Sequence, residues 1–174
     1  QLLPAITAVN AEMKLSERNF SNAIALSSQA ITMAGQQHPE VTIQSKYVHG
    51  LARAFSGGQK EAQKFCDEAL NAASNAGDFG LHSRALLAAA EAALARNDGQ
   101  QALLLATQAQ ERAARGGQLA SEWRGWTIMA RANALLGNTG QSADQLRKAS
   151  ELRGNLEREW GTEAFKNYSS RPDI

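Results

Sequence analysis

The sequence is poor in the residues that most other fold classes and many functional sites require. Among its 174 residues there are one cysteine, three prolines and few aromatic side chains, which make up 6% of the chain. Val and Ile together number only nine, whereas β-sandwiches and barrels are rich in β-branched and aromatic residues. A single cysteine excludes an internal disulfide and any multi-cysteine metal site. These scarcities argue against an all-β fold and against a disulfide-stabilised one.

Neither sign of charge is in excess, since 18 basic and 17 acidic residues are interspersed along the chain. Composition therefore gives no support for electrostatic binding to nucleic acid or to a membrane surface. The longest apolar runs, such as residues 85–90, are far shorter than the roughly 18 residues that a membrane span needs. The lone cysteine fits a reducing compartment, and we expect a cytoplasmic location. Because the chain starts at Gln1 with a helical pattern already under way, we expect a fragment of a longer protein.

Alanine and leucine dominate instead, with 33 and 19 copies, and they repeat at a fixed spacing. Four polar breaks that contain Gly or Asn are each followed by a small residue. These small residues are Ala23, Ala62, Ala102 and Ser142, which are separated by 39, 40 and 40 residues. Seven residues further on, the same spacing recurs at Ala30, Ala69, Ala109 and Ala149. A second series of breaks falls between these, so that each unit of about forty residues contains two helices.

We therefore predict an all-α fold, a right-handed α-α superhelix of four antiparallel helix pairs. The predicted helices span residues 2–17, 20–35, 39–56, 59–76, 79–96, 99–115, 118–137 and 140–156. They group into units of about 1–37, 38–77, 78–117 and 118–156. After these units we expect a capping helix over 157–168, which would give the last pair an outer face that tolerates water. The tail, residues 169–174, is predicted to be extended.

The small residues of this pattern resemble those of tetratricopeptide repeats. Gly50 fits the small residue late in the first helix of that family's unit, and Ala62 with Ala69 fits its paired alanines in the second. Units of about forty residues are longer than the family's usual 34 and resemble the arrays of large bacterial signalling proteins, such as LuxR-type ATP-dependent activators and repeat-bearing Ser/Thr kinases. The resemblance implies a module that binds partners on its concave face, within a larger signalling or regulatory protein.

No catalytic, metal or cofactor motif accompanies the repeats in the sequence. The Gly-containing segments 56–60 and 137–141 lack the Gly-Lys-Ser/Thr ending of a phosphate-binding loop and are better explained as turns. His38, His49 and His82 are 11 and 33 residues apart, without a second ligand at helical spacing. Cys66 lies midway between two alanines of the inward face, which favours a buried small hydrophobe over a nucleophile. We predict no enzymatic activity, no cofactor and no metal.

The surface best suited to binding is the inner wall formed by the first helices of successive units. Aligned by the repeat, these helices present a basic track beside an apolar patch, in a candidate set of Gln44, Tyr47, Leu51, Phe55, Arg84, Leu87, Glu91, Arg124, Thr127 and Arg131. Arginine suits an acidic ligand because its planar fork grips carboxylates at two points. In the competing interpretation, Glu91 lies between Arg84 and Arg131 and neutralises them in weak surface pairs, and Tyr47 and Phe55 are simply core.

Two functions follow from this surface. The first is a protein-interaction module or scaffold that holds a peptide, a partner domain or another part of its own parent chain in the concave groove. The second is a sensor domain that binds a small molecule there and regulates an attached enzyme or DNA-binding domain. Self-association into a homo-oligomer through the ends of the array is a third possibility, while direct binding to nucleic acid or membrane is not expected.

Overall fold

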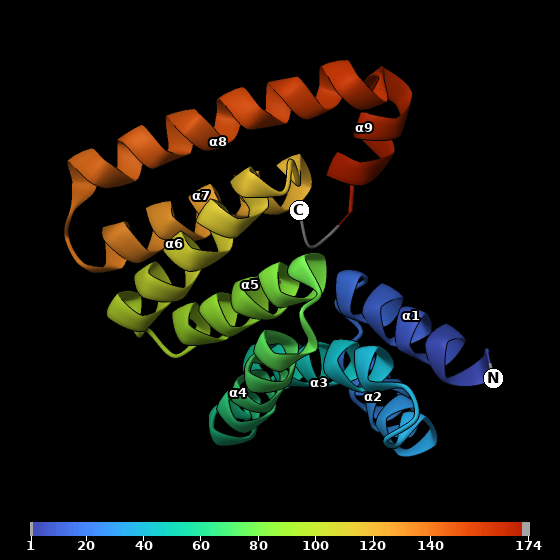
Figure 1. The fold of residues 1–174 in the computed structure, drawn as a ribbon. Helices are drawn as coiled ribbons and strands as arrows, with labels where there is room; N and C mark the ends of the chain where they lie inside the picture. The colour runs from blue at the N-terminus through green and yellow to red at the C-terminus, as the bar shows by residue number, and fades with distance from the viewer. Residues whose placement is uncertain (1, 172–174) are drawn as a thin grey trace.

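The computed structural model describes residues 2–171, and within that range it contains nine α-helices and no strand (Figure 1). The helices are α1 Leu3–Ser16, α2 Phe20–Ala34, α3 Pro39–Phe55, α4 Gln59–Ala76, α5 Phe79–Ala95, α6 Gly99–Arg115, α7 Leu119–Leu135, α8 Thr139–Trp160 and α9 Thr162–Ser169. The predicted all-α repeat fold is confirmed, because the first eight helices form four consecutive pairs.

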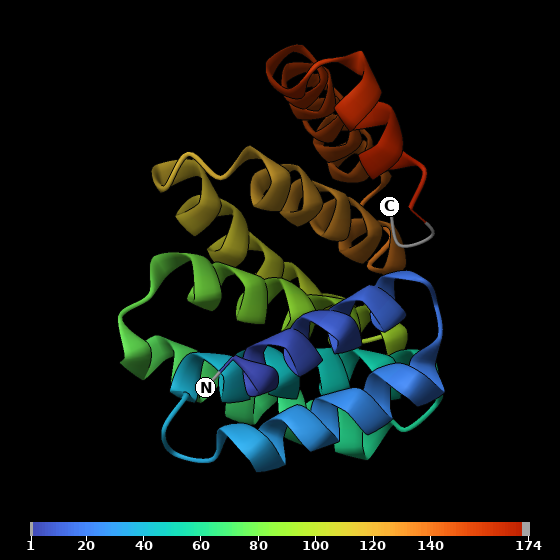
Figure 2. The same ribbon diagram turned by 90° about the vertical axis from the view of Figure 1, so that its right-hand side faces the viewer.

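The pairs stack into an α-helical solenoid. Each helix packs on the next along the chain, and in addition the first helix of each pair packs on the first helix of the following pair, α1 on α3, α3 on α5 and α5 on α7. Within residues 2–171 the second helices make no such contacts with one another. The first helices therefore form a continuous inner wall, and the second helices lie outside it (Figures 1 and 2).

The repeating small residues lie where helices approach each other closely. Ala23, Ala62 and Ala102 are at most 1% exposed, and the set seven residues later (Ala30, Ala69, Ala109 and Ala149) is also buried. Only a small side chain allows two helix backbones to approach within about 8–10 Å. The packing between helices thus explains the periodicity that the sequence displays.

The turns inside the pairs repeat with the same period. A residue with positive φ ends the first helix of each pair: Arg18, Gly57, Asn97 and Gly137, spaced by 39, 40 and 40 residues. Glycine adopts this conformation without a steric penalty and asparagine tolerates it, whereas Arg18 is the unusual occupant. Aspartate side chains cap the start of two helices. Asp78, between the second and third pairs, accepts a hydrogen bond from the Leu81 N–H of α5 at 2.7 Å, and Asp98, inside the third pair, accepts one from the Gln101 N–H of α6 at 3.0 Å.

The C-terminal end differs from the prediction in its boundaries. The eighth helix does not end at 156 but continues to Trp160, because residues 157–159 are good helix formers, and Gly161, with φ 82°, terminates it. The capping helix therefore begins at Thr162 instead of 157 and includes Ser169, which had been assigned to the tail. Ser170 and Arg171 follow this helix as a turn and a bend, and the last three residues of the predicted extended tail, 172–174, lie outside the described residues. In the part of the chain that is described, no helix is long and apolar enough to cross a membrane.

Candidate functional site

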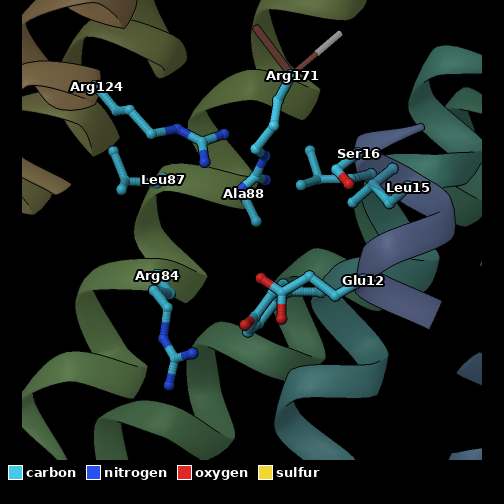
Figure 3. A pocket seen from close by; sticks show the side chains of 10 residues that line it. Glu12, Leu15, Ser16, Arg84, Leu87, Ala88, Arg124 and Arg171 are labelled. Atoms are coloured by element: carbon cyan, nitrogen blue, oxygen red, sulfur yellow. The ribbon is translucent and has the colours of Figure 1, made fainter. Parts of the chain in front are cut away.

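The inner wall contains a cavity where the four first helices come together. Figure 3 shows Arg84 and Leu87 of α5 and Arg124 of α7 on one side, and Glu12 and other α1 side chains on the other. The lining is completed by residues of α1, α3, α5 and the C-terminal segment, namely Leu15, Ser16, Tyr47, Leu51, Ala88 and Arg171. The cavity has a volume of about 80 Å³. At about 10–15 Å³ per water, this space holds a few water molecules or one small polar group.

Tyr47 is the most unusual side chain of this cavity. It is 4% exposed, and its Oη atom is buried without a hydrogen-bond partner among residues 2–171. Burial, reinforced by the nearby negative charge of Glu12, raises the pKa of this hydroxyl well above its usual value, so Tyr47 stays protonated. A buried hydroxyl without a partner costs about 1–3 kcal/mol, and most such groups bind a protein atom or water. Tyr47 therefore has a hydroxyl that no described residue satisfies, on a side chain that lines the cavity.

Charged groups of both signs surround this hydroxyl. Glu12 accepts a hydrogen bond from Gln44 Nε2 at 2.7 Å, and Arg124 forms an ion pair with Glu91 at 2.9 Å. The Arg124–Glu91 pair is partly buried, with side chains 30% and 16% exposed. Arg84, in contrast, is exposed and forms no hydrogen bond or ion pair with any residue in the range 2–171. Arg84 is thus a cation without an ion-pair partner within this range, with Glu12 lining the same cavity.

The structure brings half of the predicted set together at this cavity and distributes the rest around it. Five members line the cavity: Tyr47, Leu51, Arg84, Leu87 and Arg124. Gln44 and Glu91 lie next to it: Gln44 donates a hydrogen bond to Glu12, and Glu91 pairs with Arg124. Glu91 pairs with Arg124 and not with Arg84 or Arg131, the two arginines that it was expected to neutralise.

Three predicted residues lie elsewhere. Phe55 packs against Phe20, with ring centroids 5.7 Å apart, and lies under the guanidinium of Arg18. Thr127 donates a hydrogen bond to the Trp123 carbonyl oxygen one turn earlier in α7. Arg131 lines a separate, shallow hollow together with Leu94, Asn97, Ala134 and Leu135. These three residues thus lie outside the cavity that the other five predicted residues line.

Sequence reasoning did not place Glu12, Leu15, Ser16, Ala88 or Arg171 in the site. Glu12 had a usable signal, because it occupies the position in α1 that Leu51 occupies in α3. Arg171 had none, since it follows the last repeat and reaches the cavity only because α9 turns back from the end of α8 (Figure 1).

A second polar cluster ties α2, α3 and α4 together away from the groove. His49 is 3% exposed; its Nδ1 lies 3.2 Å from the hydroxyl oxygens of both Ser27 and Ser28, and its Nε2 lies 3.4 Å from Glu61 Oε1. The ring also stacks on Phe65, with centroids 4.1 Å apart. Burial lowers the pKa of His49, although Glu61 partly opposes this shift.

This combination of residue types occurs in serine hydrolases, but the geometry here does not provide for acyl transfer. Both serines lie inside α2, where backbone N–H groups are used in the helix and none is free to bind an oxyanion. Ser27 is also fully buried. We therefore assign the His49 cluster a structural role. No group of three or more potential metal ligands is found in the described part of the chain.

No protein-family model and no curated protein sequence matches this chain. The fold and the site alone define its class: an α-helical repeat solenoid whose inner wall contains a small cavity lined by arginines and a tyrosine.

Proposed function

We propose that this chain is a protein-interaction module, similar in construction to tetratricopeptide-repeat arrays, that holds a polypeptide segment in its groove. The main support is Tyr47, which lines the same cavity as Arg84 and Arg124 and whose buried hydroxyl has no hydrogen-bond partner in the described part of the chain. An oxyanion placed there would accept a hydrogen bond from Tyr47 and pair with Arg84, which forms no ion pair with another described residue although Glu12 lines the same cavity.

The size of the cavity favours a polypeptide anchor over a free small molecule. Pockets for drug-sized ligands enclose roughly 300–1,000 Å³, whereas this cavity has about 80 Å³. A single Asp or Glu carboxylate fits this space, and the rest of the segment would lie along the inner wall. The apolar side chains beside the cavity, Leu51 and Leu87, would contact hydrophobic residues flanking the acidic one.

A binding assay with matched peptides tests the proposal. Fluorescein-labelled peptides carrying one Asp or Glu between leucine or phenylalanine residues are compared with partners in which Asn or Gln replaces the acid. We expect the best acidic peptides to bind at least tenfold more tightly than their amide partners, and this difference to disappear in Arg84→Ala. Arg115→Ala serves as the control, because Arg115 is an exposed arginine at the end of α6, on the outer layer.

Equal affinity for acidic and amide peptides would contradict the carboxylate anchor. Binding that survives unchanged in both Arg84→Ala and Tyr47→Phe would place the ligand outside this groove. Saturable binding of small organic acids, without any binding of peptides, would favour a sensor of small molecules, the alternative function.

A further inference from the structure

The first helix carries an apolar stripe that is about half exposed, although Arg171 lines a hollow beside Val9 and Met13. Ile6, Val9 and Met13 are 53%, 51% and 52% exposed, and Leu2 continues the stripe at 76%. Their spacing places them on one face of α1, opposite the buried Ala11. A helix that is apolar on both faces is normally buried on both. Figure 2 shows α1 on the near side of the molecule, with this end of the array open.

The later repeats show what covers the equivalent positions in the other first helices. At the repeat spacing, the positions of Ile6, Val9 and Met13 recur in α3, α5 and α7, and all nine equivalents are buried: Ser45, Ala85 and Gly125; Val48, Ala88 and Ile128; Ala52, Ala92 and Ala132. In each case the second helix of the preceding pair packs on that first helix, as α2 packs on α3. The same surface is thus covered three times by the same kind of element.

The opposite end of the array has a different character. The outward face of α8 carries exposed charged residues, Asp144, Arg147, Glu151 and Arg158, and α9 closes the end of the helix. A polar outer face is what a terminal repeat needs in water. The asymmetry shows that the apolar stripe on α1 is not a general property of the ends of this solenoid. It also makes head-to-tail stacking of copies unfavourable, because the charged side chains of α8 would lose water without gaining polar partners on the apolar face of α1.

We propose that the outer face of α1 is a packing surface for a further helix pair of the same kind, whose second helix lies on α1 as α2 lies on α3. The chemistry of the partner follows from side-chain size. Ile6, Val9 and Met13 are mostly larger than their buried equivalents, so the helix opposite them must present small residues at helical spacing. Helix α4 has this character, because Ala69 and Ala73 share a core cluster with Leu81, Ala85 and Ala88 of α5.

An extended chain tests this inference directly. A second copy of residues 38–79, which contain α3 and α4, is placed immediately before Gln1, so that the copied α4 meets α1 in the register it has with α5. We expect hydrogen–deuterium exchange of the α1 amides to slow at least tenfold relative to the parent chain, and Tm to rise. The same extension carrying Ile6→Glu/Val9→Glu should leave the added residues unprotected, whereas Leu146→Glu, on an exposed position of α8, should not disturb the docking.

Two results would overturn the proposal. One is an extended chain whose α1 amides exchange as fast as those of its Ile6→Glu/Val9→Glu version. The other is a parent chain that sediments as a stable dimer and becomes monomeric on Ile6→Glu/Val9→Glu, since the stripe would then be an interface between copies. Neither result depends on the groove, so both leave the proposed function standing.

Discussion

Gly50 shows at the scale of one residue why the repeat requires small side chains. A Cβ atom at this position would lie 2.5 Å from Cys66 Sγ and 3.1 Å from the Ala62 carbonyl oxygen in α4. Burial raises the pKa of the Cys66 thiol to about 12, so this residue acts as a neutral packing group, as the sequence predicted. The close approach of α3 and α4 thus depends on a missing side chain.

Gly50→Ala is expected to destabilise the fold by about 1–3 kcal/mol, the usual cost of overpacking. This cost outweighs the roughly 0.5–1 kcal/mol that alanine otherwise gains over glycine in a helix. Cys66→Ala in the same chain should recover only part of the loss, because the backbone contacts remain. Urea unfolding measures each variant. Gly154→Ala is the matched control and should be stabilising, since a Cβ there meets nothing within 4 Å; a neutral Gly50→Ala would contradict the close packing.

His49 links stability to pH through its burial. Because burial lowers its pKa in the folded protein, the unfolded chain, with a pKa of about 6.5, binds a proton more readily. This contribution to stability is complete above about pH 6.5 and is lost as the pH falls toward the folded pKa. We expect the free energy of unfolding to decrease between pH 7 and pH 5, and His49→Gln to show a shallower decrease. An equal slope in both proteins, measured by urea unfolding, would contradict the assignment.

At the scale of elements, the helices are set by the periodic alanines together with the turns between them. The sequence sufficed for seven helices to within a residue or two, because Gly, Asn and Asp mark each turn and small residues mark each close contact. It placed the end of α8 too early, since the repeat period gave no information after residue 156. The docking of α9 depends on Tyr168, which no repeat position marks: its ring packs on those of Trp160 and Phe165, and its hydroxyl accepts a hydrogen bond from Trp123 Nε1.

Helix α9 is held by few contacts, so Tyr168 is important for its position. The Tyr168 Oη atom accepts the Trp123 Nε1–H at 3.1 Å, and its ring meets that of Trp160 edge-on at 5.2 Å. Tyr168→Phe should cost about 0.5–1.5 kcal/mol, the net value of one hydrogen bond, and Tyr168→Ala should cost more and increase Trp123 exposure. Fluorescence quenching by acrylamide measures that exposure. Unchanged quenching in Tyr168→Ala would show that α9 is held in some other way.

At the scale of the whole molecule, the first helices form one surface from four separate repeats. Periodic alignment predicted which helices form the inner wall, but depth within the groove depends on how the helices tilt and on where the chain turns back. For this reason Leu51 and Leu87 line the cavity, whereas Phe55, one turn beyond Leu51, packs beside Phe20. The position of Arg171 beside the cavity depends on α9, which no repeat pattern describes.

The most direct test of a ligand-binding inner wall is hydrogen–deuterium exchange with and without the tightest acidic peptide from the binding assay. If the ligand binds the inner wall, we expect new protection on α3, α5 and α7, little change on α2, α4 and α6, and loss of the protection in Arg84→Ala. Protection confined to the second helices, or the same protection in wild type and Arg84→Ala, would contradict the claim that this cavity anchors the ligand.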